Sequence, residues 1–300
     1  MPEFEFALYD AFTDQRFGGS PAALVHNSDS LSAEQMQKIA REFAAPATGF
    51  ISYVDDSKIK VRFFSTQTEY PMCGHGTIAL ASWLVEREEI KLSNKKEIQI
   101  ETPESSAQLY LKNLDNFGVR VDMALAAAHF QEWTEDHDTW ARLLNIKPSS
   151  ISTALPVGYT DSDFRHLIVP INEVSEVNSI QPDLGGIRHY CLENKVDTVM
   201  VFCKADNSNA NIHCREFCPA VGTPEAAASG TTNRALACYL HQFKGFDFPV
   251  DGETLIKVEQ GIEMGRPSQI FTQVETRGGK IKGLYVGGTA VKTLEGRLSV

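Results

Sequence analysis

The sequence predicts a protein of mixed helices and strands that is built from two similar domains. Its 300 residues, with 42% hydrophobic and 22% charged side chains, are enough for about two globular domains with buried cores. Segments with the apolar spacing of strands alternate with segments of helical spacing, which is typical of the α+β and α/β classes. A stretch of the first half also recurs in the second half, and this repeat favours duplication of one domain.

The first half is predicted to combine strands with one amphipathic and one buried helix. Ser32 is the expected N-cap of the amphipathic helix, because Gln35 stands where a capping box places its partner. A second helix at 78–85 is hydrophobic on most of its circumference and must therefore be buried. The expected strands are 5–12, 22–25, 48–53, 60–64, 97–101, 107–112 and 118–123.

The second half shows a similar mixture of elements. Helices are expected at 126–146 and 174–180, and residues 223–225 are expected to form a loop. The expected strands are 151–157, 165–170, 198–204 and 215–219.

The repeat relates two helix starts that are 156 residues apart in the sequence, at Cys73 and Ser229. Residues 73–84 read CGHGTIALASWL and residues 229–240 read SGTTNRALACYL, so five of the twelve positions are identical. Glu69 falls opposite Glu225 in the same alignment. Agreement in the order of the flanking segments favours duplication over a chance match between two apolar helices.

The repeat also suggests where the chain divides. The segment 61–64 before the first helix resembles 214–217 before the second, and strand-rich segments follow both helices. We therefore expect an N-terminal domain at 1–125 and a C-terminal domain at 126–300, with 288–300 as an alternative completion of the first domain.

Composition excludes several classes of protein. The formal net charge of -11 argues against a nucleic-acid binder, which needs clustered basic residues to displace counterions. The six cysteines are too sparse for a disulfide scaffold and are expected to be free thiols. The sequence contains no apolar run long enough for a membrane span and no signal-peptide pattern, so a cytoplasmic protein is expected, with no membrane partner.

The starts of the two repeated helices are the expected binding elements. Gly74 and Gly230 stand just inside these helices, where backbone N–H groups without intrahelical partners and the positive end of the helix dipole favour a carboxylate. One such end in each domain predicts a cleft between the domains that holds a small acid. The alternative is that these glycines, with Gly18 and Gly19, serve only turns and packing.

Several motifs together resemble the PhzF family of phenazine biosynthesis PhzF-like proteins. The matches run in order along the chain and are specific as a set, although each is weak alone. They are Asp10-Ala-Phe-Thr13, Phe17-Gly-Gly-Ser-Pro-Ala-Ala23, Met72-Cys-Gly-His-Gly-Thr77, Arg165-His-Leu-Ile-Val-Pro170, Phe217-Cys-Pro219 and Gln260-Gly-Ile-Glu-Met-Gly-Arg-Pro-Ser268.

The resemblance implies an α+β protein of the diaminopimelate epimerase type. Two pseudo-symmetric domains would each roll a mixed sheet around a central helix, with the active site in the cleft between them. It also implies isomerisation by proton transfer without a metal or an organic cofactor, and a homodimer.

This sequence departs from the family's catalytic pattern at two positions. The position of the family's catalytic Glu is Ala47, and the position of its Asp is Ala226, so only His75 remains of the three expected side chains. A methyl group cannot transfer protons, and the reaction of the phenazine enzymes is therefore not expected by that route.

Other families with the same fold suggest a different base. Diaminopimelate epimerases and proline racemases use two cysteines, one at the start of each central helix. Here Cys73 occupies the first of these positions, whereas Ser229 occupies the second. A thiol near a helix N-terminus and beside His75 is expected to have a lowered pKa, which would make it a competent base. The alternative is a small buried residue without a catalytic role.

The candidate catalytic residues are His75, Cys73 and Glu225. Glu225 is the one carboxylate near the second motif, although its repeat partner Glu69 suggests a structural pair instead, and His75 has a structural alternative too. The candidate substrate-binding residues are Gly18, Gly19, Ser20, Gly74, Gly76, Ser229, Gly230 and Thr231.

No metal site is expected. His213 and Cys214 with Cys218 do not have the spacing of a zinc site.

The expected function is a cofactor-independent isomerase or epimerase that transfers a proton on a small carboxylate-bearing metabolite. One alternative is a catalytically reduced homologue that binds a small acid or a protein partner, because Ala47 and Ala226 replace the usual acids. A second alternative is a one-base amino or imino acid dehydratase, or a racemase-like enzyme, that uses Cys73.

Overall fold

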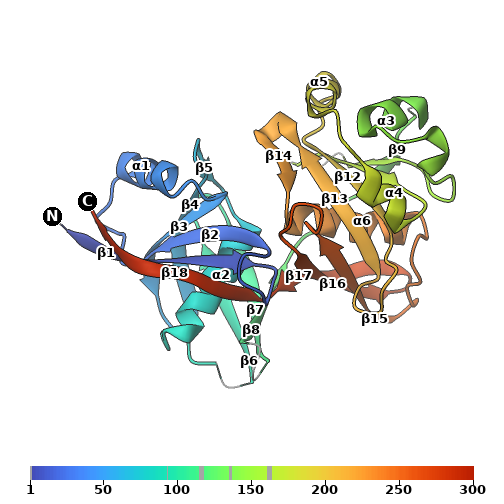
Figure 1. Ribbon diagram of the computed structural model, residues 1–300. Coiled ribbons are helices and arrows are strands. Elements are labelled where there is room, and N and C mark those ends of the chain that lie inside the picture. Colours follow the sequence, from blue (N-terminus) through green and yellow to red (C-terminus); the bar gives the residue numbers. More distant parts are fainter. Residues whose placement is uncertain (1, 93, 115–117, 135–136, 161–163) are drawn as a thin grey trace. The chain divides into compact units, whose positions relative to one another are not determined.

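The computed structural model describes residues 2–92, 94–114, 118–134, 137–160 and 164–300 (Figure 1). The chain forms two compact units. The first unit comprises Met1–Ala124 together with Gly287–Val300, and the second comprises Leu125–Val286. The C-terminal segment therefore returns to the first unit, where it supplies a strand.

In the residues that the structure describes, the first unit has eight strands around one helix, with a short two-residue strand and a second helix beside them. Its elements are β1 (Glu3–Ala11), β2 (Ser20–Val25), α1 (Ala33–Phe43), β3 (Ala47–Val54), β4 (Lys58–Phe64), β5 (Glu69–Tyr70), α2 (Gly74–Glu86), β6 (Lys95–Glu101), β7 (Ser106–Asn113), β8 (Val119–Ala124) and β18 (Ala290–Ser299).

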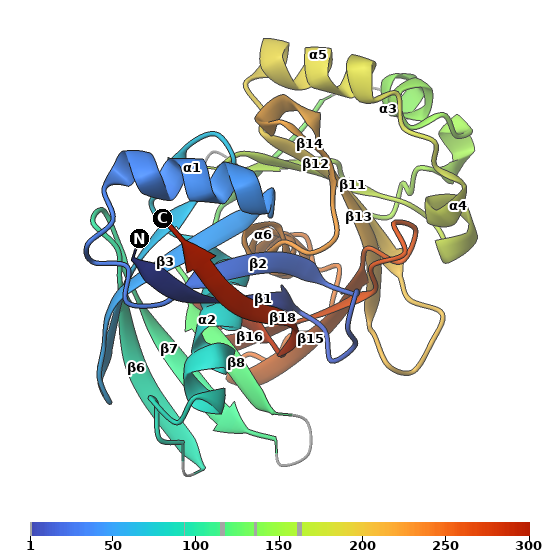
Figure 2. The ribbon, with the colours of Figure 1, turned by 60° about the vertical axis from the view of Figure 1, so that its left-hand side comes forward.

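Helix α2 is the core of the first unit. It packs against β1, β2, β3, β8 and β18, and every residue from Gly76 to Leu84 is buried. This enclosure explains why the helix is apolar on all sides. Helix α1 lies on the outer side of the sheet beside β3 (Figure 2). Its Met36 and Ile39 side chains pack against Phe50 of β3 and Phe64 of β4.

The second unit repeats this plan and adds helices on its outer face. Its elements are β9 (Phe130–Glu132), α3 (His137–Leu144), the 3-10 helix Pro148–Ser150, β10 (Gly158–Thr160), β11 (His166–Pro170), α4 (Val174–Ser179), α5 (Leu184–Asn194), β12 (Thr198–Lys204), β13 (Ile212–Cys218), the 3-10 helix Pro219–Val221, β14 (Thr223–Ala226), α6 (Gly230–Gln242), β15 (Gly252–Gln260), β16 (Ser268–Arg277) and β17 (Lys280–Gly288).

Strand pairing shows that the two units share one topology. In the first, β2 is parallel to β3, β3 antiparallel to β4, β4 parallel to β6, and β6 antiparallel to β7. In the second, β11, β12, β13, β15 and β16 have the same orientations in the same order. Both β4 and β13 also pair with a short strand that leads into the central helix. The predicted internal repeat is therefore confirmed.

The two faces of the β11–β13 sheet have different neighbours. Leu167, Val199 and Phe217 belong to a buried cluster with side chains of α3, α4 and α5. Thr198 and Phe202 of β12 lie on the opposite face from Val199. The Phe202 ring contacts that of Tyr239 of α6 edge to face, with ring centroids 5.6 Å apart. Since side chains alternate along a strand, the first face points outward and the second points toward α6.

Most of the expected elements are present, including the helix that starts at Ser32. The Ser32 side chain accepts a hydrogen bond from the Gln35 backbone N–H, and the Gln35 side chain accepts one from the Ser32 backbone N–H. The predicted capping box is therefore confirmed.

Several expectations for the second unit were wrong. Residues 126–146 are not one helix, because Phe130 to Glu132 pair with β10, and among the described residues of this stretch the helix is His137–Leu144. Residues 151–157 are not a strand, although Ile151 makes an isolated bridge to Ile171. Pairing and packing between distant segments override local propensity in both places.

Two further elements were not expected. Residues 223–225 belong to strand β14, since β13 supplies a pairing partner despite Pro224. Helix α5 was not predicted, because Gly185 and Gly186 fall in its first turn. Asp183 caps this turn by accepting a hydrogen bond from the Gly186 N–H.

The capping box gives a test of local stability. Substitution Ser32→Ala removes one cap interaction of α1 and should lower the free energy of unfolding by about 1 kcal/mol. Urea denaturation measures this difference. Ser30→Ala, in the exposed turn before the helix, is the matched control and should change stability by less than half as much.

Candidate active site

The predicted catalytic residues of the first unit meet at the start of α2. Cys73 is the N-cap residue and is buried, and the helix begins at Gly74. The Cys73 Sγ atom lies 3.5 Å from Nδ1 of His75, which is partly exposed. The thiol and the imidazole are thus neighbours on the first turn of the buried helix.

Burial controls the protonation of both groups. It raises the pKa of the Cys73 thiol to about 12, and hydrogen bonds from the Gly76 and His75 backbone only partly oppose this shift. Burial lowers the pKa of His75 to about 4. The expectation of a lowered thiol pKa was therefore wrong, because desolvation outweighs the helix N-terminus. At neutral pH the pair consists of a thiol and a neutral imidazole.

The two glycines of this turn have different surroundings. A side chain at Gly76 would place a Cβ atom 2.7 Å from the Phe63 ring, so this glycine is required for packing. A Cβ at Gly74 would meet only Met123 Cε, at 3.8 Å. Gly74 therefore leaves room beside the first backbone N–H groups of α2, as an anion site requires.

Gly18, Gly19 and Ser20 form the buried entry to strand β2. Gly19 has a φ of +56°, and a Cβ there would lie 2.2 Å from the Ala11 carbonyl oxygen. This close approach gives Gly19 a structural reason, whereas the binding role of all three residues stays a prediction.

The start of α6 carries the predicted residues of the second unit. Ser229 is the N-cap residue and accepts a hydrogen bond from the Thr232 backbone N–H. Its hydroxyl also lies 3.2 Å from that of Thr231, which is exposed, and Gly230 begins the helix. Ser229, Gly230 and Thr231 are therefore adjacent on one helical turn.

The two positions that lack the family's acids face the central helices. Ala47 begins β3 and stands beside Ala22 of β2. It lies on the same face as Gly49, whose neighbour Phe63 packs against the start of α2. Ala226 ends β14 and pairs with Glu216 of β13.

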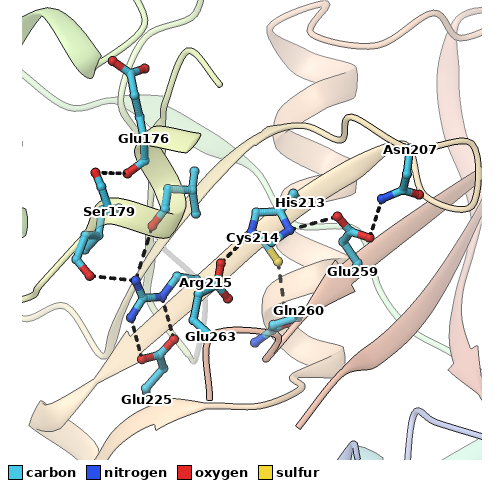
Figure 3. A network of polar contacts seen from close by, with 12 residues as sticks. Glu176, Ser179, Asn207, His213, Cys214, Arg215, Glu225, Glu259, Gln260 and Glu263 are labelled. Atoms are coloured by element: carbon cyan, nitrogen blue, oxygen red, sulfur yellow. Dashed lines mark hydrogen bonds and ion pairs between the residues drawn. The ribbon is translucent and has the colours of Figure 1, made fainter. Parts of the chain in front are cut away.

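Glu225 is held in an ion pair away from α6. Arg215 donates to both of its carboxylate oxygens, at 2.8 and 3.0 Å, and also to the backbone carbonyls of Val177 and Ile180 (Figure 3). Glu225 pairs with Phe217, whose side chain lies on the outer face. This geometry favours the structural role, and catalysis by Glu225 stays a prediction.

The same ion pair occurs in the first unit. Arg62 donates to both oxygens of Glu69 at 2.7 and 2.6 Å, on the equivalent pair of strands. The expected correspondence between Glu69 and Glu225 thus extends to their arginine partners.

His213 belongs to a separate buried network. Its ring nitrogens lie 3.0 Å from Glu259 and 2.7 Å from Glu263, and Asn207 donates to the other oxygen of Glu259 (Figure 3). Although burial opposes it, the two carboxylates raise the pKa of His213. Within the described ranges, no group of three or more His, Cys, Asp or Glu side chains could hold a metal ion. All six cysteines are free and buried.

Sequence reasoning missed two titratable residues near the start of α6. Glu216 is only 2% exposed and His166 is 0% exposed, yet both lie next to Thr232 on the first turn of the helix. The repeat could have pointed to Glu216, because the aligned position in the first half is Phe63. A carboxylate thus stands where the other copy has an apolar side chain.

The two ion pairs differ in burial and should differ in their effect on stability. The Arg215 and Glu225 side chains are 6% and 14% exposed, against 30% and 31% for Arg62 and Glu69. Glu225→Ala leaves a buried guanidinium without its partner and should lower the free energy of unfolding by about 3 kcal/mol. Glu69→Ala is the matched control and should lower it by about 1 kcal/mol or less. Equal effects in urea denaturation would contradict a buried structural role for Glu225.

No helix in the part of the chain that the structure describes combines the length and the apolar character needed to cross a membrane.

Comparison with known proteins agrees with the fold and the motifs. The Bacillus anthracis phenazine biosynthesis protein of the PhzF family has a similar crystal structure, with a TM-score of 0.88, 25% sequence identity and 100% coverage of both chains. A hydroxyproline epimerase from Agrobacterium vitis shares the fold, with a TM-score of 0.61 at 11% identity over 99% of this chain and 92% of that one. The α+β fold of two pseudo-symmetric domains is thus shown.

Sequence comparison finds relatives along almost the whole chain. "Uncharacterized isomerase YddE" of Escherichia coli K12 is 28% identical over 286 residues, covering 94% of each protein. The trans-2,3-dihydro-3-hydroxyanthranilate isomerase of Pseudomonas aeruginosa is 26% identical over 293 residues, covering 97% of this chain and 98% of that protein. A family model described as "Phenazine biosynthesis-like protein" matches residues 9–296. The chain therefore belongs to the phenazine biosynthesis-like (PhzC-PhzF) family.

Proposed function

We propose that this protein is an isomerase that transfers a proton on a small carboxylate-bearing metabolite, with His75 as the proton acceptor. Family membership and the isomerase names of its relatives support the general class. The observation that carries the residue assignment is the neutral, partly exposed imidazole of His75 on the first turn of α2, one residue from the open position at Gly74.

The backbone at the start of α2 is suited to bind the carboxylate of the substrate. The N–H groups of the first turn lack intrahelical partners, and the helix dipole favours a negative charge there. Because the Gly74 position is open, an anion can approach this backbone closely. When the neighbouring carbon loses a proton, negative charge spreads onto the bound carboxylate, and the N–H groups that hold the carboxylate stabilise that charge.

His75 suits proton removal better than Cys73 does. The pKa of His75 near 4 keeps its imidazole unprotonated at neutral pH, so that a ring nitrogen can accept a proton. The pKa of Cys73 near 12 keeps the thiol protonated, and its Sγ lies within 3.8 Å of both ring nitrogens of His75. Cys73 thus contacts the imidazole and holds its orientation. This chemistry requires neither a metal nor an organic cofactor.

A second candidate is a homologue that binds a small acid or a protein partner without turnover. Ala47 and Ala226 favour it, because both face a central helix where the family's acids would stand. A homodimer and a cytoplasmic location stay predictions of the family resemblance and of the sequence.

Proton exchange with solvent tests the proposal directly. Amino acids and cyclic imino or hydroxy acids are incubated with the enzyme in D2O, and loss of the α-proton is followed by NMR. The wild-type protein should exchange at least one of them, and His75→Asn should reduce kcat by about 100-fold or more. Cys73→Ala should reduce it by less than about tenfold.

The outcomes separate the candidates. Unchanged exchange in both variants would refute proton transfer at the start of α2. Binding of an acid without exchange would favour the reduced homologue, and loss of exchange in Cys73→Ala alone would favour the one-base enzyme that uses Cys73.

The pH profile tests the state of His75. Since only the unprotonated imidazole accepts a proton, kcat/KM should fall on the acid side near pH 4, rather than near the ordinary value of 6.5. In the unfolded chain His75 binds a proton near pH 6.5, whereas in the folded protein it does so near pH 4. The free energy of unfolding should therefore decrease as the pH falls from 6.5 toward 4. An acid limb near pH 6.5 would contradict the lowered pKa of His75.

A further inference from the structure

Four buried polar side chains meet at the first turn of α6 in the second unit. Thr232 Oγ1 donates a hydrogen bond to Glu216 Oε1, and Nδ1 of His166 lies 3.3 Å from the same hydroxyl. Thr198 Oγ1 lies 2.8 Å from the same His166 nitrogen. His166, Thr198 and Glu216 come from the three neighbouring strands β11, β12 and β13. They share the face that points toward α6.

The first unit has apolar or small residues at the matching places. Phe63 aligns with Glu216 and Gly76 aligns with Thr232, so a ring against a glycine replaces the acid and its hydroxyl partner. Ala47 takes the place of Thr198, because the register of β3 with β4 matches that of β12 with β13. The fold is therefore stable without polar groups here, and packing alone does not explain Glu216.

Burial of the Glu216 carboxyl group costs free energy. Among the described residues its Oε2 atom has no hydrogen-bond partner, and the same holds for Nε2 of His166. Burial raises the pKa of Glu216, while hydrogen-bonding groups of Thr232, Thr198, Ser229 and Gln260 partly oppose the shift. A buried carboxyl with a raised pKa is a typical proton donor in active sites.

A chain of hydroxyl groups links Glu216 to the partly exposed end of α6. Ser229 Oγ lies 3.0 Å from Thr232 Oγ1, and either of these atoms can donate. Ser229 is partly exposed and stands at the position of the second cysteine of related racemases. Its hydroxyl is too weak an acid or base alone, but a carboxyl two hydrogen bonds away can supply or accept the proton.

We propose that Glu216 is the proton donor of the second unit and acts through Thr232 and Ser229, in place of the acid absent at Ala226. The inference rests on the proposed isomerase function, which it deepens. Glu216 and Ala226 are direct partners across β13 and β14, so the acid has moved to the neighbouring strand on the same face. Ser229 would contact the substrate, and Glu216 is a positioning residue that supplies Ser229 with a proton through Thr232.

The proposed step is a proton relay. The carbanion of the substrate takes the Ser229 hydroxyl proton and forms a new C–H bond. Ser229 takes the proton of Thr232, whose hydroxyl turns from Glu216 toward Ser229, and Thr232 takes the proton of Glu216, whose O–H bond breaks. The negative charge thus passes from the substrate carbon to the Glu216 carboxylate, which regains a proton from water.

The charged and titratable groups around Glu216 are consistent with this direction. His166 does not compete as a donor, because burial, aided by the charge of Arg234, lowers its pKa to about 3 and keeps it neutral. On β13 itself, burial raises the pKa of Cys214 and Cys218, so both stay protonated. Arg234 of α6 is the one cation that acts on this cluster through the described interactions.

The experiment compares Glu216→Gln with the wild type in the D2O exchange assay, on any substrate that the wild type exchanges. Glu216→Gln should lower kcat by about 100-fold while KM changes less than threefold, and the alkaline limb of the wild-type pH profile should disappear. Thr232→Val should show the same loss, and Thr232→Ser should restore most of the activity. Glu89→Gln, beyond the other end of α2, is the matched control for loss of a partly buried carboxylate and should keep full activity.

An infrared spectrum tests the donor without any substrate. A protonated carboxyl band at neutral pH should be present in the wild type and absent in Glu216→Gln. If Glu216→Gln does not fold, Ser229→Ala breaks the same relay at its partly exposed end and should show the same loss of kcat.

The two proposals fail in different ways. Wild-type exchange with unchanged kcat and pH profile in Glu216→Gln, or in Ser229→Ala, would overturn the role of Glu216 and leave the isomerase standing. A missing protonated band would also overturn it. No exchange by the wild type on any compound would overturn the isomerase, and the relay with it.

Discussion

Burial of the middle turns of one helix in each unit is the constraint on which the rest of the structure depends. Strands pack around α2 and α6, so their side chains are apolar along most of their length. Their first turns carry the backbone N–H groups that have no intrahelical carbonyl partner. Polar chemistry is therefore concentrated at Cys73 and His75 in one unit and at Ser229 and Thr232 in the other. The same burial determines the protonation of Cys73 and His75, because it disfavours the charged form of each group.

Much of the fold was predictable because its signals are local or repeated. The capping box at Ser32 and the aligned helix starts identified real elements, and the repeat identified the duplication. Helix α5 and strand β14 were missed, since glycines obscured the helix and the strand depends on its partner β13. For the candidate site, the sequence predicted the adjacency of Cys73 and His75 but not their protonation. The sequence placed Cys73 beside His75, yet the raised pKa of the thiol follows from burial that only the folded chain reveals.

The two units act as controls for one another. An arginine–glutamate pair recurs in both, so it is most simply part of the shared scaffold. The inner faces differ, with Phe63 against Gly76 in the first unit and Glu216 against Thr232 in the second. Because the two units share one backbone plan, these differences are not required for folding. They mark where each copy has acquired its own chemistry.

The pairing of Glu216 with Ala226 has a consequence for how such proteins are classified. A motif search examines positions along the chain, and by that measure this protein has lost its acid. A sheet brings two strands together, and residues ten apart in the sequence share one location in space. An acidic group can therefore cross from one strand to the next by two substitutions, with the backbone unchanged. Loss of a motif residue is then evidence of inactivity only when its neighbour across the sheet has been inspected as well.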